Sequence, residues 1–308
     1  MWRSVGFFLL YMILLTNSWG QSGPVQLTVA FPAGSGTDIS ARIFADSLQQ
    51  QIGRPVVVMN RGGASGTIGS RAVAGANPDG NSLGFLTSMP ITLQSHIMKL
   101  NIRPEDFTPI CRVSEFPTSL VASPRSGFST LKAAIDAAKS KPGSLNLGIA
   151  GLYSGPHLAA MRFLEAANVN MLVVPHQGDN NAIQPLLTGE LDLAFAQPQF
   201  GPANGFKVLA VSSKERTPLL PDAPTFSELG LPVVNTVSAG LLGPKNLPPE
   251  LAIALEAACK TITTSAAFEE RMTKIGIAIS YAPSTVYARQ LMEDWQSMRA
   301  FGEGVPIK

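Results

Sequence analysis

The sequence predicts an α/β protein built as two lobes, and three observations lead to that prediction. Short β-rich apolar runs alternate along the chain with segments whose apolar residues recur every three to four positions, which is the spacing of a helix face. Glycine-rich turns separate a strand from the following helix at several places. The alternation begins again after Pro124, so we expect two α/β lobes, each of ordinary domain size.

The composition excludes several classes of protein. The 308 residues carry 23 basic and 21 acidic side chains, with no Lys/Arg cluster of the kind that a nucleic-acid-binding face needs. A hydrophobic content of 45% excludes a disordered chain. Two cysteines are too few for a disulfide scaffold. We therefore expect a globular protein with no nucleic-acid partner.

Residues 1–20 are predicted to be a cleaved signal peptide. Arg3 precedes an apolar run at 5–15, and Ser18 and Gly20 are small residues where a signal peptidase would cut. The run of about 11 residues is shorter than the roughly 20 that span a bilayer, which disfavours an uncleaved membrane anchor. The mature chain is therefore expected to be a soluble periplasmic protein.

The first α/β unit begins with a β-rich run at 25–31, which ends in the turn 32–36. Thr37 or Asp38 can then cap a helix that closes at Gly53. The apolar side of this helix consists of Ile39, Ile43, Phe44, Leu48 and Ile52.

The strand expected at 55–59 is fully apolar, as a strand buried within a parallel sheet would be. A second glycine-rich loop, 60–66, leads into a helix that reaches about residue 76. A turn at 78–80 then leads into a strand at 82–87. This βαβαβ succession is typical of an α/β layer.

The second unit repeats the pattern, beginning with a helix capped by Ser129 or Thr130. The turn 151–155 leads into a helix with Pro156 at its first position, where a missing N–H costs nothing. A polar loop at 176–180 precedes another helix. The strands of this unit are expected at 145–150, 171–175, 191–196 and 207–211.

The last quarter of the chain follows a proline-rich stretch at 218–224. We expect there a strand at 236–242, a helix at 249–264, a strand at 277–281 and a closing helix capped by Ser284. Periodicity alone does not assign this quarter to either lobe.

Three strand–turn–helix junctions carry the functional signal, at 32–38, 60–66 and 151–157, with a fourth polar loop at 176–180. Glycine lets the backbone approach a ligand closely, and the first turn of a helix leaves N–H groups unpaired at the positive end of its dipole. Gathered at the carboxyl ends of strands, such helix starts form a receptor for a small anion, a carboxylate or a phosphate. One such loop is more often an ordinary turn, but three together favour a binding site.

The sequence gives little support for an enzyme, and we expect no catalytic residues, no cofactor and no metal. The dinucleotide fingerprint lacks its third glycine and its acidic residue, and no Walker loop is present. The histidines and cysteines lie too far apart for a metal site. A hydrolase centred on Ser154 and His157 is the enzymatic alternative, although Ser154 lies one position off a nucleophile elbow.

Two further questions stay open in the sequence. Cys111 and Cys259 could pair in an oxidising compartment or remain two small buried hydrophobic residues. Asp38 would repel a bound anion unless its oxygens are engaged as a helix cap or face an amine on the ligand.

A set of ordered motifs runs through nearly the whole mature chain. In the first half they are Pro32–Asp38, Asn60–Gly66 and Asn77–Gly80. In the second half they are Ser154–Ala159, Leu187–Asp192 and Arg216–Thr225. Together they resemble the Bug family, the extracytoplasmic solute receptors of tripartite tricarboxylate transporters.

The resemblance implies a type II periplasmic-binding-protein fold, in which two α/β lobes, each a sheet flanked by helices, are joined by two crossover segments. By that likeness the crossings lie near 115–121 and 231–237. The first lobe is then 24–118 plus 236–308, and the second lobe is 119–235.

The resemblance also implies a ligand and a site. Two first-lobe loops would hold a carboxylate through backbone N–H groups and water, with Phe31, Pro32, Ala33, Gly34, Ser35, Thr37, Asp38, Gly62, Ala64 and Ser65. Ser154, His157, His176 and Asp192 would face them from the second lobe.

The implied function is capture of a small organic carboxylate (a di- or tricarboxylate, or an acidic or aromatic acid) and its delivery to membrane permease subunits, by a protein expected to be monomeric. A ligand-sensing receptor that acts on a signalling partner is the alternative.

Overall fold

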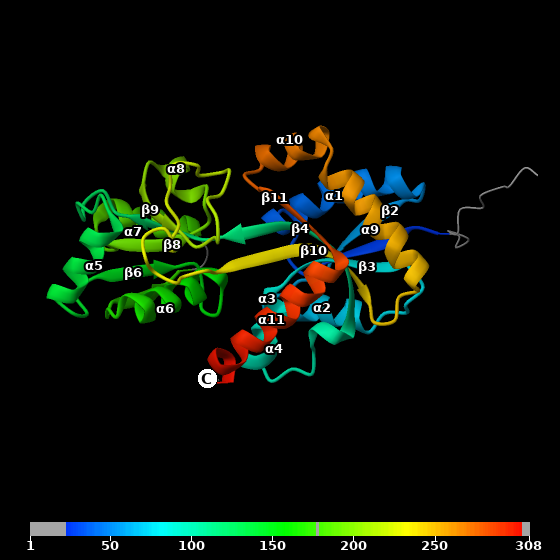
Figure 1. Cartoon of the computed structure of the whole chain (residues 1–308), viewed down its shortest axis with the longest axis horizontal. Helices are drawn as coiled ribbons and strands as arrows, with labels where there is room; N and C mark the ends of the chain where they lie inside the picture. Colours follow the sequence, from blue (N-terminus) through cyan, green and yellow to red (C-terminus); the bar gives the residue numbers. More distant parts are fainter. Residues whose placement is uncertain (1–22, 177–178, 304–308) are drawn as a thin grey trace, which may run out of the picture.

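The computed structural model describes residues 23–176 and 179–303, so the predicted signal peptide lies outside the described residues. The strands form two separate sheets, and each sheet has helices on both faces (Figure 1). We call the six-stranded sheet with its helices the first lobe, and the five-stranded sheet with its helices the second lobe. The predicted two-lobed α/β class is confirmed.

The first lobe contains a mixed sheet in the order β11-β4-β10-β3-β1-β2. Strands β1, β2 and β3 run parallel, and β10 and β4 pair antiparallel beside them. The bounds are β1 (Val25–Val29), β2 (Val56–Asn60), β3 (Ser82–Thr87), β4 (Phe107–Pro117), β10 (Thr236–Pro244) and β11 (Ile279–Pro283).

The helices of the first lobe cover both faces of this sheet. Helices α1, α9 and α10 pack on one face, and α2 and α11 pack on the other. Their bounds are α1 (Gly36–Ile52), α2 (Thr67–Ala74), α3 (Met89–Thr92), α4 (Gln94–Ile97), α9 (Pro249–Thr263), α10 (Ala266–Lys274) and α11 (Ser284–Glu303), with short 3₁₀ turns η1 (Ala64–Gly66) and η2 (Pro104–Asp106).

The second lobe contains a sheet in the order β7-β6-β8-β5-β9, with β6, β7 and β8 parallel and β5 antiparallel to its neighbours. Helices α5 and α6 pack on one face, and α7 and α8 pack on the other. The bounds are β5 (Ser119–Ala122), α5 (Leu131–Ser140), β6 (Asn146–Ile149), α6 (Gly155–Ala167), β7 (Leu172–Pro175), η3 (Asp179–Ala182), α7 (Ile183–Thr188), β8 (Leu193–Ala196), α8 (Phe200–Asn204) and β9 (Lys207–Val211).

The chain crosses between the lobes twice, and the two crossings lie side by side. Strand β4 ends at Pro117 and β5 begins at Ser119 in the other sheet, while the return crossing enters β10 at Thr236, which pairs with Pro117. Ser212 ties the crossings together, because its Oγ accepts from the Thr118 amide (2.8 Å) and donates to the Asn235 carbonyl (2.6 Å). Both sheets therefore meet at one shared, hydrogen-bonded junction.

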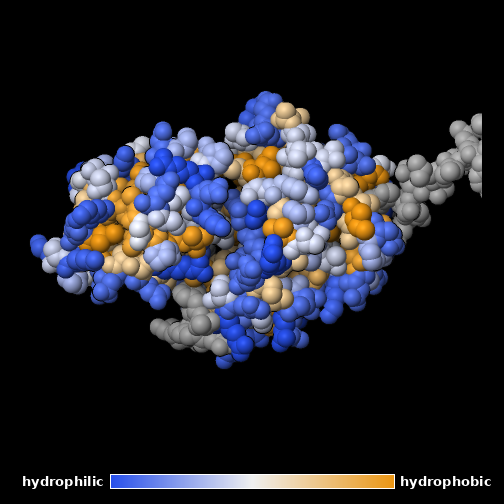
Figure 2. All heavy atoms as spheres, viewed as in Figure 1, coloured by the Kyte–Doolittle hydropathy of each residue, from blue (hydrophilic) through white to orange (hydrophobic). Residues whose placement is uncertain are grey.

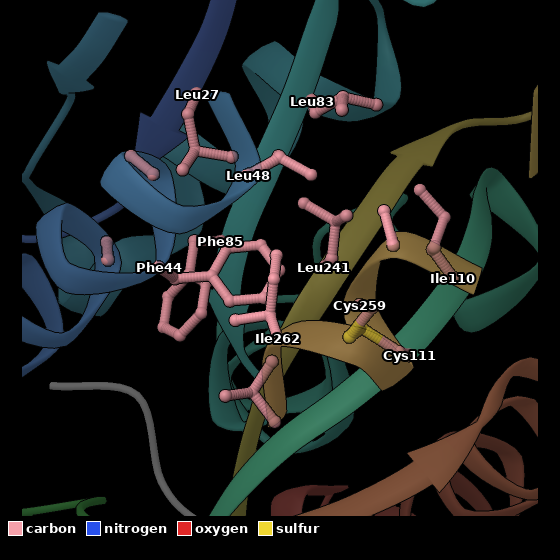
Figure 3. Packing of buried hydrophobic residues seen from close by; sticks show 14 of the residues in the cluster. Leu27, Phe44, Leu48, Leu83, Phe85, Ile110, Cys111, Leu241, Cys259 and Ile262 are labelled. Atoms are coloured by element: carbon pink, nitrogen blue, oxygen red, sulfur yellow. A yellow bond between two sulfur atoms is a disulfide. The ribbon is translucent and has the colours of Figure 1, made fainter. Parts of the chain in front are cut away.

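The largest core lies in the first lobe between the sheet and helices α1 and α9 (Figure 3). The rings of Phe44 and Phe85 lie 5.6 Å apart at its centre. Cys111 of β4 and Cys259 of α9 are both fully buried in this core and form a disulfide with a Cα–Cα distance of 6.6 Å. Of the two alternatives that the sequence left open for the cysteines, the structure shows the disulfide.

Strand β2 differs from the sequence-based prediction of a fully buried strand. It runs parallel to β1 as predicted, but it is an edge strand, and Val57 and Met59 are 44% and 39% exposed. The edge position leaves one face of the strand without a covering helix, which an apolar sequence by itself does not reveal.

Two helix starts also differ in detail from the prediction. Helix α1 is capped by Ser35, whose Oγ accepts from the Asp38 amide, so neither Thr37 nor Asp38 is the cap residue. Pro156 is the second residue of α6, after Gly155, and not the first. Both positions still lie in the first turn, where amides have no intrahelical acceptor.

The face shown in Figure 2 is largely hydrophilic, with hydrophobic residues in separate small patches. Among the described residues, no single helix combines the length and hydropathy needed to cross a membrane; α9 and α10 do so only when taken together, and they meet at 70°.

Candidate functional site

The loops that follow the parallel strands of the two lobes face each other across the crossings. Thr87, at the carboxyl end of β3, pairs with Ala239 of β10, three residues from the crossing at Thr236. Ala196, at the carboxyl end of β8, pairs with Ser119, the first residue after the other crossing. Strands β1 and β2 run parallel to β3, and β6 and β7 run parallel to β8. The loops after β1 and β2 therefore lie at the same edge of the first sheet as Thr87, and those after β6 and β7 lie at the same edge of the second sheet as Ala196.

Asn60 joins the two first-lobe loops that the sequence singled out. It is the last residue of β2, and its Nδ2 donates to the Phe31 carbonyl at 3.1 Å and to Asp38 Oδ1 at 2.7 Å. The chain passes so closely here that a Cβ on Gly62 would lie 3.4 Å from Cδ of Pro32. The structure thus brings 31–38 and 62–65 together, as the sequence predicts for the ends of adjacent parallel strands.

Asp38 holds this arrangement and does not reach toward a ligand. Its side chain is 3% exposed, and it accepts hydrogen bonds from the Gly34 amide (2.8 Å), Arg42 Nε (3.0 Å) and Asn60 Nδ2 (2.7 Å). Burial raises the pKa of the Asp38 carboxyl, but the hydrogen bonds from Arg42, Asn60 and Gly34 and the charge of Arg42 outweigh burial, so the pKa lies below its ordinary value of 3.8. The Asp38 oxygens are thus occupied by donors of the protein itself, which is the condition under which this carboxylate need not repel a bound anion.

Several backbone amides in these two loops have no acceptor among the described residues, and four of them lie at helix starts. These four belong to Gly36 and Thr37 in the first turn of α1, and to Ala64 and Ser65 in η1. Within the first loop, the Gly34 amide donates to the Asp38 carboxylate and the Asp38 amide donates to Ser35 Oγ. The positive end of the α1 dipole adds to the attraction that these donors exert on an anion.

The backbone of the second loop is held in an unusual conformation. Ala64 and Ser65 have φ values of 46° and 54°, in the left-handed region that costs a side-chain-bearing residue on the order of 1–3 kcal/mol. Gly66 continues at 91°. Successive amides in such a conformation point into one concavity, which is a recurrent way of binding an anion.

In the second lobe, Ser154 and His157 form the start of α6. Ser154 Oγ accepts from the His157 amide (3.3 Å) and donates to the Gly151 carbonyl (2.7 Å), while His157 Nδ1 accepts from the Tyr153 amide (2.9 Å). Burial lowers the pKa of His157 below its ordinary 6.5, so the ring is neutral at pH 7.

This geometry does not support the hydrolase alternative. The His157 ring accepts a backbone hydrogen bond at Nδ1, and the Ser154 hydroxyl donates to a carbonyl rather than to this ring. A serine nucleophile needs its hydroxyl proton within reach of a base.

His176 lies near the other predicted site residues of the second lobe, whereas Asp192 does not. The His176 amide donates to the Ile149 carbonyl at 2.8 Å, which places His176 beside the 150–154 loop, and its Nε2 is buried without a partner among the described residues. Asp192 precedes β8, and its Oδ2 accepts from the amide of Asn146 at the start of β6 (2.8 Å). Asp192 therefore lies at the far edge of the sheet, and the structure does not bring it to the other site residues.

The lobes contact each other on both sides of the crossings. Gln94 Nε2 of the first lobe donates to the Tyr153 carbonyl of the second at 2.7 Å, beside an apolar cluster that includes Leu93 and Leu158. On the other side, a Cβ on Gly276 would lie 3.4 Å from Cγ of Gln199. Residues of the two lobes therefore lie next to each other at both of these places.

The predicted ligand-site residues did not include Asn60 or Gln94, although Asn60 is the first residue of the predicted loop 60–66. Asn60 could have been found as a polar residue directly after a parallel strand. Nothing in the local sequence indicates a role for Gln94, because its partner is 59 residues away.

Among the described residues, no group of three or more His, Cys, Asp or Glu is arranged to hold a metal ion.

Two α/β lobes joined by paired crossings, with strand-end loops facing one another, define a two-lobed solute-binding protein of the periplasmic type. The chain belongs to the tripartite tricarboxylate transporter receptor family (TctC), whose sequence profile matches residues 40–301. The Bug-family resemblance drawn from the motifs is confirmed.

Several relatives illustrate this membership. The chain is 32% identical to Protein BugT of Bordetella pertussis over 241 residues, which cover 75% of this chain and 74% of BugT. A TctC solute-binding protein from Polaromonas, solved without ligand, matches with a TM-score of 0.80 at 28% identity over 91% of this chain and 96% of that one. MatC from Rhodopseudomonas palustris, solved with bound malate, matches with a TM-score of 0.73 at 26% identity over 91% of this chain and 99% of that one.

Proposed function

We propose that this protein is a periplasmic receptor that captures a small organic carboxylate between its two lobes and delivers it to a membrane permease. The observation that carries the proposal is the set of four unpaired amides at Gly36, Thr37, Ala64 and Ser65, on two touching loops that face the second lobe. Hydrogen bonds to a charged acceptor are the strong ones, and fixed amides need no reorganisation to make them. Malate bound to the related MatC supports a carboxylate as the ligand.

The ligand site comprises the first-lobe loops 31–38 and 62–65 with Ser154, His157 and His176 of the second lobe. A ligand that contacts both lobes stabilises their closed arrangement, because only that arrangement provides both sets of contacts. The proposal also includes a signal peptide at 1–20 that is cleaved, a membrane permease as the partner and a monomeric protein. The boundaries between the lobes are placed at 118/119 and 235/236.

A thermal-shift screen of the mature chain against carboxylates, amino acids, sugars and cations tests the proposal. A carboxylate at a hundred times its dissociation constant should stabilise the fold by about 2.7 kcal/mol. A flat response to every carboxylate, with a shift for a sugar or a cation, would remove the proposal.

The substitution Thr37→Pro tests the amide directly, because proline removes one unpaired N–H without breaking an intrahelical bond. The chain itself supports this design, since α6 already carries Gly155-Pro156 at the positions that Gly36 and Thr37 hold in α1. Losing one hydrogen bond to a carboxylate costs roughly 1.5–3 kcal/mol, so affinity should fall at least about tenfold. The control is Lys132→Pro at the same position of α5, where affinity should stay unchanged.

A further inference from the structure

Gln94 links the first lobe to the loop that precedes α6 in the second lobe. It is the first residue of α4, it is only 3% exposed, and its Nε2 donates to the Tyr153 carbonyl at 2.7 Å. Its Oε1 is buried without a partner among the described residues. Burying an amide oxygen without a hydrogen bond costs stability, so the role of this side chain lies in the bond that it makes to Tyr153.

The contact around this hydrogen bond is small and closely packed. Leu93 of the first lobe and Leu158 of α6 are 0% and 2% exposed, and they belong to one apolar cluster. Met298 of α11 completes this cluster, and Tyr153 packs against it. Beyond it, α6 and α11 are separated by a groove of about 590 Å³ that Met161 helps to line. On this side of the crossings, the lobes therefore pack closely at the start of α6.

Tyr153 is held in a backbone conformation that needs support from its surroundings. Its φ is 60°, in the left-handed region, where a residue with a side chain persists only when neighbouring groups hold it. Within the second lobe its amide donates to His157 Nδ1 at 2.9 Å, and its carbonyl accepts from Gln94 of the first lobe. Separation of the lobes removes the second of these bonds and leaves the peptide that follows Tyr153 free to reorient.

The Tyr153 carbonyl and the Ser154 amide belong to the same peptide plane. This peptide bond is trans, so the Ser154 N–H points in the direction opposite to the Tyr153 carbonyl. By holding the carbonyl, Gln94 therefore also fixes the direction of the Ser154 N–H. The Ser154 amide has no acceptor among the described residues, and it lies in the loop after β6, at the edge of the second sheet that faces the first lobe.

We propose that Gln94 is a positioning residue of the ligand site: through the Tyr153 carbonyl, the first lobe orients the Ser154 amide of the second lobe as a donor to the bound carboxylate. This inference rests on the proposed function and adds a residue to it. An amide whose direction is fixed in advance loses little freedom when the ligand binds. Because Gln94 reaches Tyr153 only while the lobes are docked, the donor is in place only in that arrangement, which couples lobe closure to ligand binding.

The substitution Gln94→Met tests this inference. Methionine has nearly the same length and suits a buried position, but it donates no hydrogen bond to the Tyr153 carbonyl. It also removes the unpaired Oε1, so the urea midpoint of unfolding should stay unchanged. Affinity for the carboxylate should fall about tenfold, as for the loss of one hydrogen bond to a charged group. Gln94→Asn keeps the amide but is shorter by one methylene, so it should have the same effect and carries the test if Gln94→Met does not fold.

A ¹⁵N–¹H NMR titration separates positioning from stability, with malate and with the carboxylate that gives the largest thermal shift as ligands. In the wild type the Ser154 amide signal should move downfield and saturate. In Gln94→Met this shift should fall to less than half, while the Gly36 signal still moves fully at saturation. The matched control is Gln49→Met, which removes a glutamine bond to the Val56 amide (3.3 Å) within the first lobe and should leave both affinity and the Ser154 shift unchanged.

Three results would overturn the inference and leave the proposed function standing, because the Gly36 amide would still respond to the ligand. They are a Ser154 signal that does not move in the wild type, a full Ser154 shift in the Gln94 variants, and an affinity that these variants do not lower. An equal loss of affinity in Gln49→Met would also overturn it. Failure of every carboxylate to bind the wild-type chain would overturn both the inference and the proposed function.

Discussion

Replacing Asp38 with alanine should loosen the two first-lobe loops more than any other single change of a charged residue there. Three hydrogen bonds are lost together, from the Gly34 amide at 2.8 Å, Asn60 Nδ2 at 2.7 Å and Arg42 Nε at 3.0 Å. A buried hydrogen bond to a charged group contributes roughly 1.5–3 kcal/mol, but Arg42 is half exposed and water replaces part of what is lost. We expect the free energy of unfolding to fall by about 3 kcal/mol.

Urea unfolding followed by circular dichroism at pH 7 measures this loss. The matched control is Asp136→Ala, which removes a carboxylate from an exposed helical pair with Lys132 (2.5 Å) and should cost less than about 0.5 kcal/mol. An Asp38→Ala cost no larger than that of Asp136→Ala would refute the role given to Asp38.

The same variant has a defined pH dependence. Because the folded-state pKa of Asp38 is depressed below 3.8, its contribution is present above the unfolded-state pKa and is lost as pH falls through the folded-state value. The difference in unfolding free energy between wild type and Asp38→Ala should therefore be constant near pH 6–7 and shrink below about pH 4. A difference that stays the same down to pH 2 would show that the ionised carboxylate is not what stabilises the loops.

Three other changes have expected outcomes in the same unfolding assay. The double variant Cys111→Ala/Cys259→Ala opens a loop with a sequence separation of 148 and should lose about 3–5 kcal/mol; a loss below about 1 kcal/mol would contradict the chain-entropy argument. Gly69→Ala should cost about 1–3 kcal/mol, because its Cβ would lie 2.7 Å from the Ala30 Cα and from the Arg61 carbonyl oxygen, whereas Gly75→Ala, with 3.4 Å to its nearest neighbour, should be tolerated. Burial raises the pKa of Asp294 to about 6, against the opposing charge of Arg162, so its ionisation destabilises the fold as pH rises from about 4 to 6; Asp294→Asn should therefore stabilise by about 1–3 kcal/mol at pH 7 and change little at pH 4.

The sequence predicted those parts of the fold that depend on residues close together in the chain. The βαβαβ order of the first lobe follows from short apolar runs, glycine turns and helical spacing, each within about ten residues. The crossing strand β4 was not predicted, because Phe107–Pro117 mixes prolines with Arg112 and Glu115 and shows no alternation. Its strand character comes from pairing with β10, more than a hundred residues later in the chain.

The candidate site likewise has one part that the local sequence pattern predicts and another part that it does not. The loops at 31–38 and 62–65 meet because their strands are neighbours in a parallel sheet, which the sequence pattern predicts. Asp192 shows the limit of that reasoning: it adjoins a strand, but it comes before β8 rather than after it, so it lies at the opposite edge. The inter-lobe bond from Gln94 to the Tyr153 carbonyl depends on how two lobes dock, and no local pattern encodes it.

The amides of Gly36, Thr37, Ala64 and Ser65 are the groups that we propose bind the ligand. The most direct measurement is a ¹⁵N–¹H NMR titration of the mature chain with the carboxylate that stabilises it most. The signals of these four amide protons should move downfield together and saturate with the calorimetric dissociation constant, because each amide forms a new hydrogen bond to the carboxylate. Saturable binding during which these four signals stay in place, while amides elsewhere shift, would contradict it.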